Sequence, residues 1–216
     1  SAGESNQTHY SVAVGFEAGM SGQNVYSTAL GYQAGKCGQY DRAVAVGFSA
    51  GERRQNTYAT AVGWGAGRYG QHYGAVGVGT SGGYSAQGSF ATAVGMYAGQ
   101  NSQKSNTVAI GSMAGQSTQD QYSVAVGSLA GRTSQGSYAI AIGYKTGETS
   151  QRANTVAIGS GAGQSTQGLY SVAIGSLAGH SSQGIDCVAI GMYAGWSAQN
   201  AQSVAIGMYS GTVRFA

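Results

Sequence analysis

Small and β-branched residues alternate in short segments along the whole chain. In SVAIGSLAG, residues 171–179, Val172 and Ile174 flank Ala173, and glycines follow at 175 and 179. Because successive side chains of a strand point to opposite faces, this alternation predicts a short strand with its aliphatic residues on one face and its alanine on the other. The two glycines predict turns, where the backbone takes a positive φ or passes close to another segment.

The alternating segments recur with an unbroken spacing of 16 residues. Glycine stands at position 15 and at every sixteenth position up to 207, and a second glycine column runs from Gly3 to Gly211. Sixteen residues with two glycines are too few for the paired helices of helical repeats, whereas two short strands and two turns fit. A repeat without insertions or deletions is typical of units that stack on one another. We therefore predict an all-β fold, a parallel β-solenoid of about 13 coils of 16 residues over residues 1–211, with a departure from the repeat at 212–216. At the spacing of paired strands, the solenoid would be on the order of 60 Å long.

Two arrangements of the coil interior are compatible with the alternation. In the first, the alanines fill a flat lumen, since small residues recur where space is tight, and Val and Ile form an apolar strip outside. Such a strip would reach on the order of several hundred Å², which a soluble monomer seldom leaves open, so other copies of the chain would bury it. In the second, Val and Ile fill the interior and the chain is a monomer. The first arrangement predicts an oligomer interface formed by Val12, Val14, Val44, Val46, Val108, Ile110, Val172, Ile174, Val188, Ile190, Val204 and Ile206.

Composition and charge exclude several classes of protein. The chain has 39 glycines but no proline, which excludes collagen, and only 8% charged residues, which argues against a disordered chain. The net charge is +3, and lysine and arginine are scattered apart from Arg53 and Arg54, so we predict no nucleic-acid partner. No apolar run reaches the roughly 18 residues of a membrane-spanning helix, so we predict no membrane insertion by this segment.

The units TVAIGSMAG, SVAIGSLAG and CVAIGMYAG resemble the head repeats of trimeric autotransporter adhesins. They are also similar to repeats in fibre proteins of bacteriophages and large DNA viruses. The resemblance implies a left-handed parallel β-roll and a homotrimer in which the aliphatic strand residues face a common axis. It further implies an extracellular location, on a cell surface or virion surface, and binding to a cell-surface protein or glycan. The repeats of that family are commonly shorter than 16 residues, so its ligand-binding details are not carried over.

A glutamine occupies the same position in all thirteen units. Stacked amides form hydrogen-bonded ladders in cross-β structures, which would be a structural role, whereas an exposed row would contact a polar ligand. Invariance across units whose neighbouring residues differ favours the ladder. The column consists of Gln7, Gln23, Gln39, Gln55, Gln71, Gln87, Gln103, Gln119, Gln135, Gln151, Gln167, Gln183 and Gln199.

Recognition would depend on the positions that vary between units. Aromatic faces can stack on sugar rings or on partner proteins, although rings stacked along a solenoid can also simply stabilise neighbouring coils. Both roles, ligand binding and coil stabilisation, are possible in the irregular N-terminal half of the chain. There we predict a candidate recognition surface at Phe16, Tyr32, Phe48, Trp64, Arg53, Arg54 and Arg68.

Residue types that support catalysis are not grouped by the repeat. His9, His72 and His180 fall in three different columns, which argues against a metal site. Cys37 and Cys187 lie about nine coils apart, whereas a disulfide needs Cα atoms within ~7 Å. We therefore predict a non-enzymatic protein without cofactor or metal.

Together with the resemblance, the repeat predicts a structural or adhesive fibre segment with a displayed surface, and the resemblance implies that this surface binds a receptor or matrix. A self-assembling filament subunit is an alternative, because stacked strands end in open edges. An ice-binding solenoid is a second alternative, because hydroxyl residues recur in STQ, TSQ and SSQ. The array begins within a repeat, at Ala2-Gly3, which predicts one segment of a longer fibre or a subunit capped by its neighbours.

Overall fold

Two strands alternate in every repeat of the chain. A computed structural model describes residues 1–211, and these residues form 26 short strands and no helix. Each strand pairs in parallel with strands one repeat away. The chain is thus an all-β parallel solenoid of about 13 turns, which confirms the fold predicted from the 16-residue spacing. The predicted departure at 212–216 lies outside the described residues.

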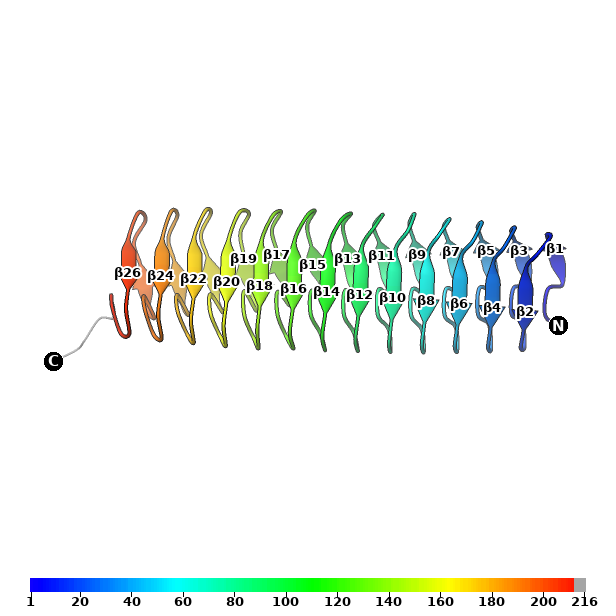
Figure 1. Cartoon of the computed structure of the whole chain (residues 1–216), viewed down its shortest axis with the longest axis horizontal. Helices are drawn as coiled ribbons and strands as arrows, with labels where there is room; N and C mark the ends of the chain where they lie inside the picture. The colour runs from blue at the N-terminus through cyan, green and yellow to red at the C-terminus, as the bar shows by residue number, and fades with distance from the viewer. Residues whose placement is uncertain (212–216) are drawn as a thin grey trace. The chain divides into compact units, whose positions relative to one another are not determined.

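The chain divides into two compact units, of which the first is Ser1–Thr107 and the second starts at Val108. In each unit, Figure 1 shows the even-numbered strands in one layer and the odd-numbered strands in a layer behind it. The odd-numbered strands of the first unit are β1 (Ser5–Gln7), β3 (Ser21–Gln23), β5 (Cys37–Gln39), β7 (Arg53–Gln55), β9 (Tyr69–Gln71), β11 (Ser85–Gln87) and β13 (Asn101–Gln103). Its even-numbered strands are β2 (Val12–Val14), β4 (Thr28–Leu30), β6 (Val44–Val46), β8 (Thr60–Val62), β10 (Val76–Val78) and β12 (Thr92–Val94).

The second unit repeats the two-layer arrangement with shorter odd-numbered strands. Its even-numbered strands are β14 (Val108–Ile110), β16 (Val124–Val126), β18 (Ile140–Ile142), β20 (Val156–Ile158), β22 (Val172–Ile174), β24 (Val188–Ile190) and β26 (Val204–Ile206). Its odd-numbered strands are β15 (Thr118–Gln119), β17 (Ser134–Gln135), β19 (Ser150–Gln151), β21 (Thr166–Gln167), β23 (Ser182–Gln183) and β25 (Ala198–Gln199).

Paired residues are 16 positions apart in both units. In the first unit Ala13 pairs with Ala29, and in the second Ala157 pairs with Ala173. Because a slip of one residue would turn every side chain to the opposite face, the alternation of alanine with larger residues holds this register. Each column of the repeat therefore becomes a row of equivalent positions.

The glycine after each even-numbered strand allows the next turn to come close. Gly175 has a φ of +123°, and a Cβ placed on it would lie 2.8 Å from the carbonyl carbon and oxygen of Gly191. L-residues rarely adopt such a φ, and no Cβ fits at that distance, so only glycine is compatible with the position. Both observations agree with the turn role predicted for this column.

The odd-numbered strands differ between the units at the residue before the glutamine. In the first unit this residue has a positive φ, as at Gly38 (+71°) and Arg54 (+56°). In the second unit it is Ser, Thr or Ala, and none of these residues has a positive φ. Glycine adopts a positive φ without strain whereas β-branched threonine does not, but serine and alanine take the positive φ in the first unit, at Ser102 and Ala86, and not in the second, so residue type at this position does not decide the backbone form.

Alanines and glutamines fill the space between the two sheets. Ala157, Ala173 and Ala189 are fully buried, as are Ala29 and Ala45 in the first unit. Because side chains alternate along a strand, the Val and Ile residues that flank these alanines point outward. Of the two arrangements that the sequence allows, the chain therefore adopts the one with alanines in the lumen.

Candidate functional site

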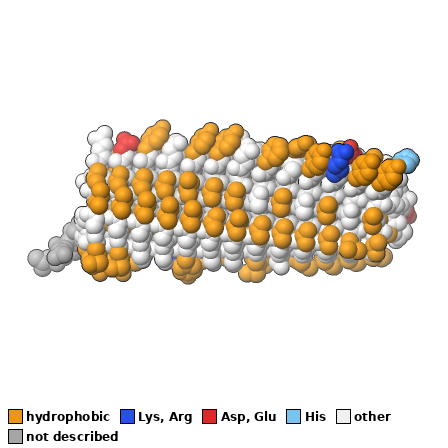
Figure 2. Space-filling model, viewed as in Figure 1, with side chains coloured by type: hydrophobic (Ala, Val, Ile, Leu, Met, Phe, Trp, Pro, Cys, Tyr) orange, Lys and Arg blue, Asp and Glu red, His pale blue; other side chains and the backbone are white. Residues whose placement is uncertain are grey.

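The outward residues of the even-numbered strands form what we call the aliphatic face of each unit. Every one of these positions holds Val, Ile, Leu or Thr, and none is charged. Figure 2 shows their hydrophobic side chains as pairs that recur from coil to coil. In the first unit Thr28, Thr60 and Thr92 interrupt the pattern, whereas the second unit has only Val and Ile. The face is therefore more uniformly apolar in the second unit.

The residues predicted for an oligomer interface lie on the aliphatic face. Val12 is 50% exposed, Ile110 40% and Ile206 63%. All twelve are half-buried or exposed, and none is buried: Val12, Val14, Val44, Val46, Val108, Ile110, Val172, Ile174, Val188, Ile190, Val204 and Ile206. A single copy of the chain thus leaves rows of aliphatic side chains in water.

The glutamine column lies inside the solenoid except at its first member, Gln7, which is exposed. The Nε2 of Gln135 donates to the carbonyl oxygen of Val124 at 2.7 Å and to that of Ala139 at 3.2 Å. Because Gln135 belongs to β17 and Val124 to β16, its amide ties the two sheets together across the lumen. The buried members are Gln23, Gln39, Gln55, Gln71, Gln87, Gln103, Gln119, Gln135, Gln151, Gln167, Gln183 and Gln199.

Hydrogen bonds between amides also run along the column. The Nε2 of Gln71 donates to the Oε1 of Gln87 at 2.9 Å, and that of Gln119 donates to the Oε1 of Gln135 at 3.0 Å. A buried amide with these partners is held by the lumen and does not face a ligand in solvent. The geometry therefore gives the column a structural role.

The four aromatic residues of the candidate recognition surface stack on one another. Ring centroids are 5.2 Å apart between Phe16 and Tyr32, 4.9 Å between Tyr32 and Phe48, and 6.0 Å between Phe48 and Trp64. The rings are nearly parallel, so each inner ring has its faces covered and presents its edge to solvent. A sugar ring stacks on an aromatic face, and the inner faces are covered here. The geometry therefore favours a role in stabilising adjacent coils over a role in glycan binding.

Two of the three predicted arginines share one buried carboxylate. The Nε of Arg68 lies 2.6 Å from the Oε2 of Glu52, and the Nε of Arg53 lies 3.6 Å from its Oε1. Burial is the largest single effect and would lower the pKa of Arg68, but the hydrogen bond to Glu52 and its charge, with smaller contributions from Tyr69 and Tyr84, together raise the pKa. The Arg68 guanidinium also lies 5.0 Å from the ring centroid of Tyr69, and burial raises the pKa of that tyrosine. Arg68 is thus a structural cation between coils.

Two shallow depressions of about 300 and 460 Å³ adjoin the third arginine, Arg54. Both are also lined by Gly70 and His72, and Tyr40 and Asn56 complete the first. Sequence reasoning selected Arg54 but missed Tyr40 and His72, because they stand in a different column of the repeat. The glycines that flank Arg54 in its own column, at 38 and 70, were the signal that space exists beside it.

Hydroxyl groups in the second unit donate to the backbone. The Oγ1 of Thr133 donates to the carbonyl oxygen of Glu148 at 3.2 Å, and that of Thr149 donates to the carbonyl oxygen of Gln164 at 3.2 Å. An ice-binding face needs ranked hydroxyls that are free to order water. At these two positions the hydroxyl hydrogen is already used within the solenoid.

Carboxylates near the surface pair with cations of neighbouring coils. Glu17 lies 2.7 Å from the Nζ of Lys36, and Glu148 lies 3.4 Å from Arg132. The hydrogen bond from Lys36, followed by one from Gln33, lowers the pKa of Glu17. The carboxyls thus serve as links between coils.

Within residues 1–211, no group of three or more His, Cys, Asp or Glu side chains could hold a metal ion. Cys37 and Cys187 are free thiols. In the same residues there is no helix of the length and hydropathy needed to cross a membrane. No protein-family model, curated protein or solved structure matches the chain. The two candidate binding surfaces are therefore the aliphatic face and the surroundings of Arg54.

His180 makes the stability of the second unit depend on pH. Its ring stacks on Trp196 with centroids 5.9 Å apart, and burial lowers its pKa. Because the unfolded chain then binds the proton more tightly than the folded one, stability is lost as the pH falls from about 7 through the folded-state pKa. We expect His180→Gln, which introduces the residue found one coil earlier at Gln164, to flatten this part of the pH profile.

Thermal unfolding of both proteins between about pH 7 and pH 5 measures the effect. A His72→Gln variant is the control for the loss of a histidine side chain that is exposed. Equal slopes in the wild type and His180→Gln would contradict the prediction.

Proposed function

We propose that this chain is a non-enzymatic fibre segment in which several copies bury their aliphatic faces against one another and display their remaining surfaces for binding. The observation that carries the proposal is the aliphatic face itself. Its outward positions are apolar or threonine in every coil, and many are exposed in the single chain. Soluble monomers rarely leave such continuous apolar patches open to water.

A second copy of the chain is the partner that best fits this face. All copies carry the same 16-residue period, so the side-chain rows of two parallel copies have the same spacing and meet coil by coil along their length. A partner without this period would lose register within a few coils. The absence of charge on the face also favours burial, because charged groups are depleted at the centres of interfaces.

The resemblance to adhesin head repeats supports the finer parts of the proposal. It favours left-handed coils, three copies around a common axis, and a position on a cell or virion surface. In such an assembly the odd-numbered strands and the turns face outward. A receptor, either a protein or a glycan, would therefore bind to those elements.

Replacing Val172 by aspartate is expected to weaken self-association by about 100-fold or more, because each copy would bury an unpaired carboxylate. Val172 lies on β22 between Val156 and Val188 of the neighbouring strands. Val172→Thr is the matched control, since threonine occupies this column naturally at Thr28, Thr60 and Thr92. Sedimentation velocity over a range of protein concentrations reports the oligomer.

A wild-type chain that remains monomeric at all concentrations would overturn the proposal. So would an aspartate variant that associates like the wild type. Species that grow continuously with concentration would indicate the filament alternative, because end-to-end addition has no closed size.

A further inference from the structure

Within residues 1–211, Arg54 is the only charged residue in its column of the repeat. It lies on β7, is exposed and has a φ of +56°. The equivalent residues of the preceding and following coils are Gly38 and Gly70, with φ values of +71° and +76°. Glycine meets this backbone form without strain, whereas a residue with a Cβ does not. Asn6, Ala86 and Ser102 share this positive φ in the same column, so what distinguishes Arg54 is its charged side chain between two glycine neighbours.

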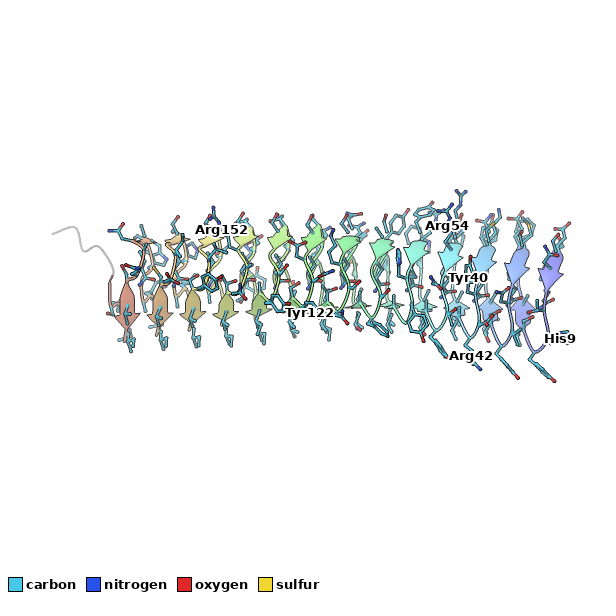
Figure 3. All side chains as sticks on the ribbon, turned by 90° about the horizontal axis from the view of Figure 1, so that it is seen from above. His9, Tyr40, Arg42, Arg54, Tyr122 and Arg152 are labelled. Atoms are coloured by element: carbon cyan, nitrogen blue, oxygen red, sulfur yellow. The ribbon has the colours of Figure 1, made fainter. Side chains whose placement is uncertain are left out.

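Its charge is not neutralised by an ion pair within residues 1–211. The nearby carboxylate of Glu52 is shared by Arg53 and Arg68, at 3.6 and 2.6 Å. Arg54 takes part in none of the ion pairs of the described chain. Arg53 and Arg54 both line the second depression, so this surface carries an excess of positive charge. Figure 3 shows Arg54 pointing away from the ribbon, on the side of the odd-numbered strands.

Glycine beside Arg54 creates the space for a ligand. A Cβ on Gly70 would have nothing within 4 Å, and depressions of about 300 and 460 Å³ adjoin the two residues. These volumes fall at the lower end of the range for small-ligand sites, which is about 300 to 1,000 Å³. The space therefore suits one or two small units of a larger ligand.

An aromatic face and an amide are available in the same depression. Tyr40 is 50% exposed, and its ring has no stacking partner in the described chain, unlike the rings of the Phe16 to Trp64 stack. The Oδ1 of Asn56 accepts a hydrogen bond from the backbone of Thr57 at 2.7 Å, which leaves its Nδ2 as a donor for a ligand. His72 is exposed at the edge.

We propose that this depression binds an anionic sugar, one that carries a sulfate or carboxylate group. The guanidinium of Arg54 matches either anion with two parallel hydrogen bonds. The Tyr40 ring offers a face for the apolar side of a sugar, and Asn56 a donor for a hydroxyl. The inference rests on the proposed function, since it names the ligand class of the displayed surface.

An acidic peptide would also satisfy Arg54 but makes no use of the open Tyr40 face. The test therefore uses four probes with the full chain: a heparin hexasaccharide, its desulfated counterpart, sialyllactose and a polyglutamate peptide. Binding is measured by isothermal titration calorimetry. We expect the hexasaccharide or sialyllactose to bind. The desulfated hexasaccharide keeps its uronate carboxylates, so a loss of binding of at least about tenfold on desulfation identifies sulfate as the anion, whereas binding of sialyllactose identifies carboxylate.

Arg54→Gly separates function from stability. It restores the residue of Gly38 and Gly70, so we expect the thermal midpoint to rise by about 2 to 4 °C while sugar binding falls at least about tenfold. Ser102→Gly is the matched control, because Ser102 has a φ of +53° in the same column and lines neither depression. It should gain stability and keep full binding. Tyr40→Ala should weaken sugar binding without changing any binding of polyglutamate.

The proposal is overturned if neither anionic sugar binds, if Arg54→Gly binds them like the wild type, or if polyglutamate alone binds. Sedimentation of the same samples keeps this result apart from the oligomer. A monomer that binds sugar through Arg54 would refute the fibre proposal and leave the sugar site standing. An oligomer that binds no anionic sugar would refute the sugar site and leave the fibre proposal standing.

Discussion

Gly175→Ala is expected to lower the free energy of unfolding by about 3 to 5 kcal/mol, because steric overlap and backbone strain act together. The new Cβ would lie 2.8 Å from the backbone of Gly191, and the φ of +123° is one that alanine rarely adopts. Gly191 cannot move away easily, because its own Cβ position lies 2.8 Å from the backbone of Gly207. The loss is measured by urea unfolding.

Gly207→Ala separates the two causes. Gly207 belongs to the same column and has a φ of +109°, but a Cβ there meets nothing within 4 Å. Only the backbone strain remains, so we expect a loss of about 1 to 2 kcal/mol. Equal losses in the two variants would show that close stacking of the turns is not what requires glycine in this column.

Gln135→Glu is expected to lower the free energy of unfolding by about 4 kcal/mol at pH 7 and much less at pH 4. The side chain would be buried among the carbonyl oxygens of Val124 and Ala139 and the Oε1 of Gln151, which accept hydrogen bonds from Gln135 in the wild type. A carboxylate cannot donate to them, so burial and these acceptors raise the pKa of the new group.

The sign follows from proton binding. With a raised pKa, the folded variant holds a proton that the unfolded chain releases, so stability is present at low pH and is lost as the pH rises through the folded-state pKa. The protonated acid donates one hydrogen bond and partly replaces the amide. Urea unfolding at several pH values measures the effect.

Gln7→Glu is the control in the same column. Gln7 is exposed, so its carboxylate stays solvated and we expect almost no loss at either pH. A Gln135→Glu variant as stable at pH 7 as at pH 4 would mean that the lumen admits water, and would remove the basis for a structural glutamine column.

The surfaces of the solenoid were predictable to different degrees. The alternation of Ala173 with Val172 and Ile174 places them on opposite faces of the strand, because strand geometry leaves no third direction. Which of the two faces is the lumen was left open by the sequence and is decided by the structure, in which Ala173 is fully buried. The stack of Phe16, Tyr32, Phe48 and Trp64 was predictable as a row. Its edge-on presentation was not, since ring orientation depends on the backbone of the turn.

The site around Arg54 shows the limit more clearly. The sequence names an arginine between two glycines, but Tyr40 and His72 lie in another column, directly after β5 and β9, and join Arg54 because these two strands pair with β7. Likewise, Glu52 is adjacent to Arg53 in sequence, yet its closest partner is Arg68 of the next coil at 2.6 Å. Pairing between coils decides which arginine stays free.

By itself, the sequence determined the period, the parallel register and the glycine turns of this protein. Each of these follows from steric rules that act on single residues and repeat every 16 positions. The tertiary structure alone decided which partners the long side chains reach. The reach of Gln135 across the lumen to Val124 depends on the separation of the sheets, and the pairing of Glu52 with Arg68 depends on how adjacent coils stack. Such distances between coils are fixed only when the repeats stack on one another, so they cannot be inferred from a single repeat.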